Sequence, residues 1–524
     1  MQSQQIKFGE KLSRGIINRS FMIAVLLALQ VVLLGTSFVL LAGYIHYIYL
    51  INVLISLIVV VYIVNRQECP EFKIAWLTFM CLLPIFGLCY YLFIELNPKL
   101  KRIVTKVQKL RAESAFLLDG NQTVLDKITA CTPRTIGLLN FLQKRGPYPV
   151  YGNTDVVYYN DGEKAFEAIK DALKNANTFI FMEYFVVSPG KLLDEIIEIL
   201  KVKATEGVEI RLMYDGLCHA KTLSYHFPKQ MKEYGIKVNV FEPFSPFLSS
   251  DQNYRDHRKM TIIDGTVAFT GGFNLADEYV NFTNPFGHWK DVAARISGDA
   301  VKTFAVLFLQ NWHLDGLKEK DDWGTFLKPD SRNTICDQNN IEAGFVVPYA
   351  DSPNVSDEIG ETVYIDILNQ AKEYVWIMTP YLILGSEILK AITYATGRGI
   401  DVKIIIPHIP DKKIPFNIAK SFYPQLMNAG VKIFEYTPGF VHAKLFVSDD
   451  IVATVGSYNL DYRSFYLNYE VGMLLVNCPA IKDISQDYIS TLQKCRQMCL
   501  VDYKALPFMS RMLGKFLRIF GPLM

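Results

Sequence analysis

Two copies of one polar pattern carry the residues whose types and spacing could do chemistry. The first copy is HRKMTIIDGTVAFTGGFN, residues 257–274, and the second is HAKLFVSDDIVATVGSYN, residues 442–459. In each copy a His is followed by a Lys two positions later, by an Asp five positions after the Lys, and by an Asn at the end. A single His near a strand is most often structural, but two histidines in matched polar frames indicate shared chemistry.

The spacing of His and Lys places both side chains on one face of an expected strand. Residues two apart on a strand point to the same side, so each imidazole lies beside an ammonium group. Lysine binds phosphate as a point charge, and an Asn amide adds hydrogen-bond donors, so the set could stabilise the charge of a phosphodiester. The candidate catalytic residues are His257, Lys259, His442 and Lys444, with Asn274 and Asn459 as phosphate-binding residues.

Two imidazoles suit a double displacement at phosphorus. One His attacks phosphorus and forms a covalent phosphohistidine, while the other protonates the leaving alcohol and then deprotonates the incoming one. A nucleophilic His needs a group that fixes its second ring nitrogen, and Asp291 and Glu470, each on a later expected strand, are the candidates. We expect no metal or other cofactor, because no carboxylate cluster with metal-ligand spacing accompanies the motifs.

Asp264 and Asp449 complete the repeated pattern at the position of a tight turn. Asp264 is followed by Gly, a strong turn dipeptide, and Asp449 by a second Asp. Turn chemistry favours a hairpin role for both. Because they belong to the same frame, Asp264 and Asp449 are also counted among the candidate catalytic residues.

The segments that must position these motifs follow the same order of strand and helix patterns in both halves. Strand patterns alternate with helix patterns, and a Gly precedes the last strand before each motif. This order predicts an α/β fold from a duplicated domain, each copy a mixed sheet flanked by helices. The expected elements lie at 179–187, 192–207, 208–215 and 228–241 in the first half (151–330), and at 374–383, 386–399, 400–408 and 423–436 in the second (331–500).

Three apolar runs predict a membrane region over residues 1–97, which a basic connector, 98–150, follows. Residues 21–43, 45–64 and 74–94 contain no Lys, Arg, Asp or Glu, and each has about the 20 residues that a bilayer-spanning helix needs. The third run contains Pro84, so a kink or a re-entrant segment is expected there. Two crossings would keep both flanking basic stretches, and the catalytic domain, in the cytoplasm.

Two further segments allow two interpretations each. Residues 501–524 form a basic amphipathic pattern with Arg511, Lys515 and Arg518 on one helical face, which is typical of a helix at a membrane surface. A terminal helix docked on the body would show the same pattern. The loop 241–255 holds three Phe and two Pro, and could contact an apolar substrate or pack on the surface.

The composition argues against a nucleic-acid partner and indicates free cysteines. The chain has 524 residues, 54 Lys and Arg against 52 Asp and Glu, and no stripe of basic and aromatic residues, so we expect no nucleic-acid partner. Its nine cysteines are scattered and odd in number, which is typical of free thiols in a reducing compartment.

The two motifs resemble the paired HxKxxxxD motifs of the phospholipase D superfamily, over residues 179 to about 476. Further segments of this chain narrow the resemblance to bacterial cardiolipin synthases. These are GGFNLADEY followed by HWKD, SYNLDYRSFYLNYE, the apolar N-terminal segments and the basic tail ending in GPLM. It implies a multi-pass protein of the bacterial cell membrane that converts two phosphatidylglycerol molecules into cardiolipin and glycerol through a phosphatidyl-histidine. The family's motif positions fall on His257, Lys259, Asp264, Asn274, His442, Lys444, Asp449 and Asn459.

The resemblance also implies that His257 is the nucleophile and that membrane lipids are the partners. The half-sites are unequal, because the first motif has Gly272 where the second has Ser457. A phospholipase D-type hydrolase and a phosphatidylserine synthase remain alternatives, since the motif residues do not distinguish acceptors. An inactive lipid-binding scaffold is a different class of function, against which the intact His–Lys pairs of both halves argue.

Overall fold

The computed structural model describes residues 45–67, 69–96, 98–118, 120–242, 253–314, 321–327, 344–353 and 358–523, with isolated positions between 25 and 36. The chain divides into two compact units. The smaller unit includes the N-terminal helices, and the larger unit includes both halves of the duplicated domain. The aromatic loop at 241–255 lies mostly outside the described residues, so its two interpretations stay open.

The N-terminal unit contains helices α3 (Ile45–Asn65), α4 (Pro70–Leu82) and α5 (Pro84–Glu95). The apolar run 74–94 is broken before Pro84, because proline has no N–H to donate and its ring disfavours a helical residue before it. The run 21–43 lies outside the described residues apart from isolated positions. No helix in the described part of the chain is both long and apolar enough to cross a membrane, so the expected membrane-spanning helices are not confirmed.

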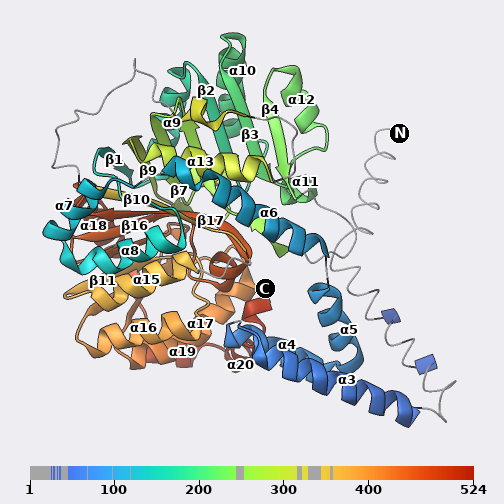
Figure 1. The fold of residues 1–524 in the computed structure, drawn as a ribbon. Helices are drawn as coiled ribbons and strands as arrows, with labels where there is room; N and C mark the ends of the chain where they lie inside the picture. The colour runs from blue at the N-terminus through green and yellow to red at the C-terminus, as the bar shows by residue number, and fades with distance from the viewer. Residues whose placement is uncertain are drawn as a thin grey trace, which may run out of the picture. The chain divides into compact units, whose positions relative to one another are not determined.

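The first half contains a mixed sheet with the strand order β1-β9-β7-β6-β2-β3-β4 (Figure 1). Strands β2, β3 and β4 are parallel, whereas β6, β7, β9 and β1 join in antiparallel pairs. The strands are β1 (Thr154–Tyr159), β2 (Phe179–Tyr184), β3 (Glu209–Asp215), β4 (Lys237–Phe241), β6 (Lys259–Ile263), β7 (Val267–Gly271) and β9 (Ala293–Gly298). The helices include α9 (Gly162–Lys174), α10 (Lys191–Thr205), α11 (Leu217–Lys221), α12 (Phe227–Glu233) and α13 (Val301–Trp312).

The second half repeats this sheet strand for strand. Its order is β10-β17-β16-β15-β11-β12-β13-β18, in which β18 (Cys495–Gln497) is an addition. The matching strands are β10 (Phe345–Asp351), β11 (Tyr374–Met378), β12 (Asp401–Pro407), β13 (Lys432–Tyr436), β15 (Leu445–Ser448), β16 (Val452–Gly456) and β17 (Asn468–Val476). The helices include α15 (Ile359–Gln370), α16 (Ser386–Gly397), α17 (Lys413–Asn428) and α18 (Ala480–Leu492).

Helix α17 differs from the sequence-based expectation. It begins at Lys413, ten residues before the expected start of the helix in 423–436, and Pro424 lies inside it. A proline within a helix removes one backbone hydrogen bond, so Pro424 is a local signal against a helix that continues through it. Burial of Ile418, Phe422 and Leu426 on one face compensates for that loss.

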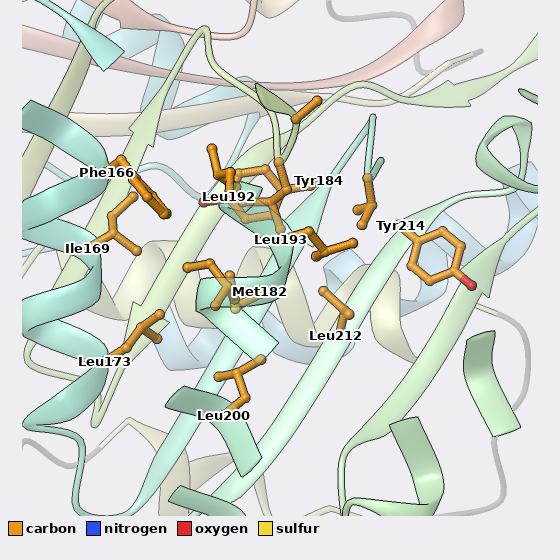
Figure 2. Packing of buried hydrophobic residues seen from close by; sticks show 14 of the residues in the cluster. Phe166, Ile169, Leu173, Met182, Tyr184, Leu192, Leu193, Leu200, Leu212 and Tyr214 are labelled. Carbon is orange, nitrogen blue, oxygen red and sulfur yellow. The ribbon is translucent and has the colours of Figure 1, made fainter. Parts of the chain in front are cut away.

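Helices α9 and α10 cover one face of the first sheet and form its core. Their apolar residues recur every three or four positions, so each helix buries one stripe. Figure 2 shows these side chains meeting those of the strands below them. Removing each large apolar side chain from water stabilises the fold by about 2 kcal/mol. The cluster includes Phe166, Ile169 and Leu173 of α9, Leu192, Leu193 and Leu200 of α10, and Met182, Tyr184, Leu212 and Tyr214 of the sheet.

The connector expected at 98–150 is helical and bonds to both halves. It consists of α6 (Pro98–Ser114), η1 (Ala115–Leu118), α7 (Gln122–Cys131), η2 (Pro133–Thr135) and α8 (Ile136–Arg145). Gln310 of the first half donates to Ser114 Oγ at 2.8 Å, and Arg111 donates to Ser352 of the second half at 3.1 Å.

The described cysteines are free thiols, and Cys336 lies outside the described residues.

Short strands pair with the opposite half next to each repeated motif. Strand β5 (Arg255–Asp256), which precedes His257, pairs in parallel with β17 of the second half. Strand β14 (Gly439–Val441), which precedes His442, pairs in parallel with β8 (His288–Lys290) of the first half. The backbone leading to each His is therefore held by the opposite half.

Asp264 and Asp449 anchor the tips of the two motif hairpins. Asp264 Oδ1 accepts hydrogen bonds from the backbone N–H groups of Thr178 and Phe179 at 2.7 and 2.9 Å, and its Oδ2 accepts from that of Asn177 at 2.8 Å. Asp449 accepts in the same way from residues 372–374. Each carboxylate thus fixes the hairpin tip to the start of the first parallel strand of its half, β2 or β11.

We predict that Asp264→Ala lowers the free energy of unfolding by about 2–3 kcal/mol, because backbone donors lose a charged acceptor. Thermal unfolding followed by tryptophan fluorescence would show a lower Tm. The control is Asp155→Ala, which removes an exposed carboxylate of β1. Equal Tm values for the two variants would contradict the anchoring role.

Candidate active site

The first candidate catalytic centre joins His257 to a carboxylate of the second half. The backbone N–H of His257 donates to the carbonyl of Tyr469 at 2.9 Å, which continues the pairing of β5 with β17. His257 Nδ1 lies 2.8 Å from Oε1 and 3.0 Å from Oε2 of Glu470. Donation from Nδ1–H to the carboxylate fixes the ring and leaves Nε2 as the reactive nitrogen.

The second centre joins His442 of the second half to a carboxylate of the first half. The backbone N–H of His442 donates to the carbonyl of Lys290 at 2.7 Å, and His442 Nδ1 lies 2.8 Å from Asp291 Oδ2. Lys444 Nζ also lies 2.8 Å from this Nδ1, but one ring nitrogen cannot both donate to Asp291 and accept from Lys444. We assign the proton to the Asp291 contact, and Lys444 donates instead to the His442 carbonyl at 2.5 Å.

Both lysines are buried beside the histidines. Lys259 Nζ donates to the carbonyl of His257 at 2.6 Å, the counterpart of the Lys444 contact. Burial lowers the pKa of Lys259 to about 8 and that of Lys444 to about 7, although Glu470 and Asp291 oppose the shift. The charge of Lys259 also lowers the pKa of Lys444, so the two ammonium groups act on one shared space. A bound anion there would relieve their repulsion.

Both imidazoles are neutral at physiological pH. Burial, followed by the charges of Lys259 and Lys444, holds the pKa of His257 well below its usual value. Burial and Lys444 lower the pKa of His442 to about 3, against the opposing effect of Asp291. A neutral ring whose Nδ1 proton is held by a carboxylate presents its Nε2 lone pair to an electrophile.

The two orienting carboxylates differ in charge balance. Burial raises the pKa of Glu470 to about 7, against the effects of Lys259 and of the Ser457 hydroxyl, which donates to Glu470 Oε2. Burial acts in the same direction on Asp291, but His442 and Lys444 outweigh it, and its pKa is lowered. A change of pH around 7 therefore changes the protonation of Glu470 but not that of Asp291.

Gly272 stands where the second motif has Ser457 because Asp291 occupies the space. A Cβ at position 272 would lie 2.1 Å from Asp291 Oδ1 and 2.9 Å from the His442 carbonyl oxygen. In the second half, the Ser457 hydroxyl occupies the equivalent place and supports Glu470. The inequality of the half-sites noted in the sequence thus reflects two ways of holding a carboxylate.

The structure brings the two asparagines to the histidine end of each hairpin and leaves the two motif aspartates at the other end. Met260 pairs with Thr270, so the chain beyond β7 lies beside Lys259, and Asp264 lies at the turn. Asn274 is buried and its Oδ1 accepts from the Val186 N–H at 3.0 Å. Its side chain also hydrogen-bonds with Tyr279, so the amide is only partly available to bind an anion. Asn459 is buried at the matching position after β16.

Arg258 is a site residue that the repeated pattern did not reveal. It is buried, and its Nε donates to the backbone carbonyl of Glu470 at 3.2 Å, while its Nη1 donates to the Leu307 carbonyl at 3.1 Å. Arg258 thereby holds the strand that carries the orienting carboxylate of its neighbour His257. The sequence contains a signal for it, because the matched position in the second motif is Ala443.

Aromatic rings enclose both imidazoles. Phe185 meets His257 edge-on with ring centroids 5.0 Å apart, and Tyr279 meets His442 edge-on at 5.2 Å. Trp289 lies 5.3 Å from His442. These rings exclude water from the imidazoles and account for much of the burial that lowers their pKa. No spacing rule in the sequence singled them out.

A group of carboxylates lies apart from the motifs. Glu358, Glu361 and Glu387 place oxygen atoms within 4.8 Å of one another around the starts of α15 and α16. Tyr466 donates to Glu361 at 2.5 Å, which supplies part of its hydrogen bonding. These carboxylates are not among the partners described above for the two histidines.

Comparison with known proteins matches both halves to one family. The family model described as "Cardiolipin synthase, PLD-like domain" matches residues 169–290 and 364–493, which contain both motifs. An "Uncharacterized protein" of Streptococcus mutans serotype c is 41% identical over 89% of this chain and 99% of its own length. Cardiolipin synthases of Halalkalibacterium halodurans and Alkalihalophilus pseudofirmus are each 33% identical over 89% of this chain and 91% of their own length.

A solved structure shares the fold at low sequence identity. The phosphatidylserine synthase of Haemophilus influenzae Rd KW20 superposes with a TM-score of 0.54 and 15% identity, covering 74% of this chain and 97% of that protein. This similarity concerns the fold alone. The relatives with 33% identity over nearly their full length establish the family, and the chain belongs to the bacterial cardiolipin synthases of the phospholipase D superfamily.

Proposed function

We propose that this protein is a phosphatidyltransferase that converts two phosphatidylglycerol molecules into cardiolipin and glycerol. The observation that carries the proposal is the paired site: two neutral imidazoles, each with Nδ1 fixed by a carboxylate, share a buried space with two lysines. The names of the relatives with 33% identity support the same activity.

In the first step, His257 Nε2 attacks the phosphorus of a phosphatidylglycerol. A P–N bond forms, and the P–O bond to the head-group glycerol breaks. The bound phosphodiester anion raises the pKa of His442, so its Nε2 takes up a proton from solvent before the reaction. His442 then gives this proton to the departing glycerol oxygen and becomes neutral. Lys259, Lys444 and the two asparagine amides stabilise the charge that accumulates on the phosphoryl oxygens.

In the second step, His442 removes the proton from a hydroxyl group on the glycerol head group of a second phosphatidylglycerol. That oxygen attacks phosphorus, the P–N bond breaks, and cardiolipin forms while His257 is restored. Glu470 and Asp291 hold the rings in place throughout and stabilise each imidazolium as it forms. Water as the acceptor would give hydrolysis instead, and the aromatic enclosure of the imidazoles favours a lipid acceptor.

We also propose that the N-terminal region attaches the enzyme to the bacterial cell membrane, with the catalytic halves in the cytoplasm. The uncharged apolar runs 21–43 and 45–64 have about the length of a bilayer-spanning helix. The substrates of the proposed reaction are bilayer lipids, so attachment would keep the enzyme at its substrate.

The activity can be tested with the full-length protein and phosphatidylglycerol vesicles, with products identified by mass spectrometry. We expect cardiolipin and glycerol from the wild type. His257→Ala and His442→Ala should each lower the rate by roughly 10³-fold or more, since neither step proceeds without its imidazole. His226→Ala, an exposed histidine outside both motifs, is the control. Phosphatidic acid and glycerol as products would instead identify a hydrolase, and full activity of both motif variants would refute the mechanism.

We predict a bell-shaped dependence of kcat/KM on pH near neutrality. The pKa of Glu470 is raised to about 7, so lowering the pH through this value protonates the carboxylate and releases its hold on His257. The pKa values of Lys444 and Lys259 are lowered to about 7 and about 8, so raising the pH removes their charges. Initial rates across pH 5 to about 10 measure both limbs as properties of the coupled site.

Ser457→Ala should move only the acid limb of this profile. The Ser457 hydroxyl donates to Glu470 Oε2 and stabilises the ionised form, so its loss raises the pKa of Glu470 and shifts the acid limb to higher pH. Ser490→Ala on α18 is the matched control. An acid limb that does not move in Ser457→Ala would show that another group titrates there.

A further inference from the structure

The C-terminal helix α20 (Phe508–Arg518) packs on α17 through its small and polar side (Figure 1). Gly514 is buried there, and a Cβ at this position would lie 2.5 Å from the carbonyl oxygen of Asn417. Ser510 donates to Asn417 Oδ1 at 3.3 Å, and the Arg518 guanidinium lies 3.8 Å from the centre of the Phe422 ring. Residues 510, 514 and 518 are four apart, so they form one stripe of the helix.

Most large apolar side chains of α20 and of the following Ile519 point away from the protein, whereas Leu517 is half-buried. Their exposed fractions range from 38% to 74%, which is the reverse of a helix that packs its apolar face on a core. A contiguous apolar surface of this kind on one short helix marks an interaction site. These outward residues, here called the α20 face, are Phe508, Met509, Met512, Leu513, Phe516 and Ile519.

The α20 face also carries positive charge. Lys515 is exposed on α20, and Lys504 is exposed on the preceding helix α19 (Leu500–Ala505). Helix α19 packs on α17 as well. Apolar side chains flanked by lysines match the interface of an anionic bilayer, in which acyl chains lie beneath negatively charged head groups.

The chain beyond α20 packs beside Ile383 of the second half. A Cβ at Gly521 would lie 3.2 Å from the Ile383 side chain. The Ile383 N–H donates to the carbonyl of Leu460 at 2.8 Å, and Leu460 directly follows Asn459. The chain that follows the α20 face therefore lies beside Ile383, whose backbone bonds to the segment that carries a proposed phosphate-binding residue.

We propose that the α20 face inserts into the surface of an anionic lipid bilayer and holds the catalytic site beside its lipid substrates. The inference rests on the proposed function, because an active site for membrane phosphodiesters identifies a lipid bilayer as the partner of the α20 face. The amphipathic pattern of residues 501–524 allowed either a docked helix or a membrane-surface helix. Docking through the polar stripe leaves the apolar face outward and makes the two roles compatible.

Photocrosslinking tests the occupant directly. The full-length protein carrying p-benzoylphenylalanine in place of Phe516 is reconstituted in phosphatidylcholine vesicles that contain phosphatidylglycerol, irradiated, and analysed by peptide mass spectrometry. We expect peptides that carry a phospholipid mass. The same probe in place of Val202, an exposed apolar residue of α10, should give none. Crosslinks to protein at position 516, within the chain or to a second copy, would overturn the proposal, as would the absence of crosslinks.

A kinetic test uses Phe516→Asp with Val202→Asp as the matched control. Placing a charge on the α20 face should raise the apparent KM for vesicle phosphatidylglycerol by about tenfold and leave kcat and Tm unchanged. An unchanged KM would overturn the proposal. Turnover by the wild type separates the two hypotheses. If the wild type does not turn over phosphatidylglycerol, the proposed function is wrong. If the wild type is active and Phe516→Asp has an unchanged KM, only the α20 inference is wrong.

Discussion

The crossing of His–carboxylate contacts between the two halves is the constraint on which the rest of the site depends. His257 takes its orienting carboxylate from β17 of the second half, and His442 takes its own from the segment after β8 of the first. The short strands β5 and β14 fix the backbone on either side of these contacts. Each half therefore lacks the carboxylate that orients its own His, so the relative position of the halves is part of the catalytic geometry.

Burial makes this arrangement responsive to an anion. Desolvation disfavours charge on the lysines and on Glu470, and the pKa values near 7 show how closely these charges are balanced. In the proposed reaction, a phosphodiester anion between the lysines would supply the missing negative charge. The halves have also diverged: Arg258 and Ser457 support Glu470, whereas Gly272 makes room for Asp291. In the proposed mechanism, such differences suit the two duplicated imidazoles to different roles, His257 as nucleophile and His442 as general acid and base.

Much of the fold and site could be predicted from local patterns. Periodicity gave the repeated order of strands and helices with end points that mostly agree within a few residues, because each element buries an apolar stripe that is visible in the chain. Asp264 and Asp449 followed from turn chemistry, and the break before Pro84 from its missing N–H. The start of α17 was wrong, since Pro424 is a local signal against helix that burial on the domain overrides.

The sequence by itself determined which residue types are the candidates for the proposed chemistry, because two matched frames place His, Lys and Asn on common faces. Only the tertiary structure decided which carboxylate serves which imidazole, since His257 and Glu470 are separated by 213 residues and meet through pairing of β5 with β17. It also decided which side of α20 faces the protein. Amphipathicity shows that a helix has two unlike faces, but the neighbour it packs against selects the buried one, and here Gly514 permits close approach to α17.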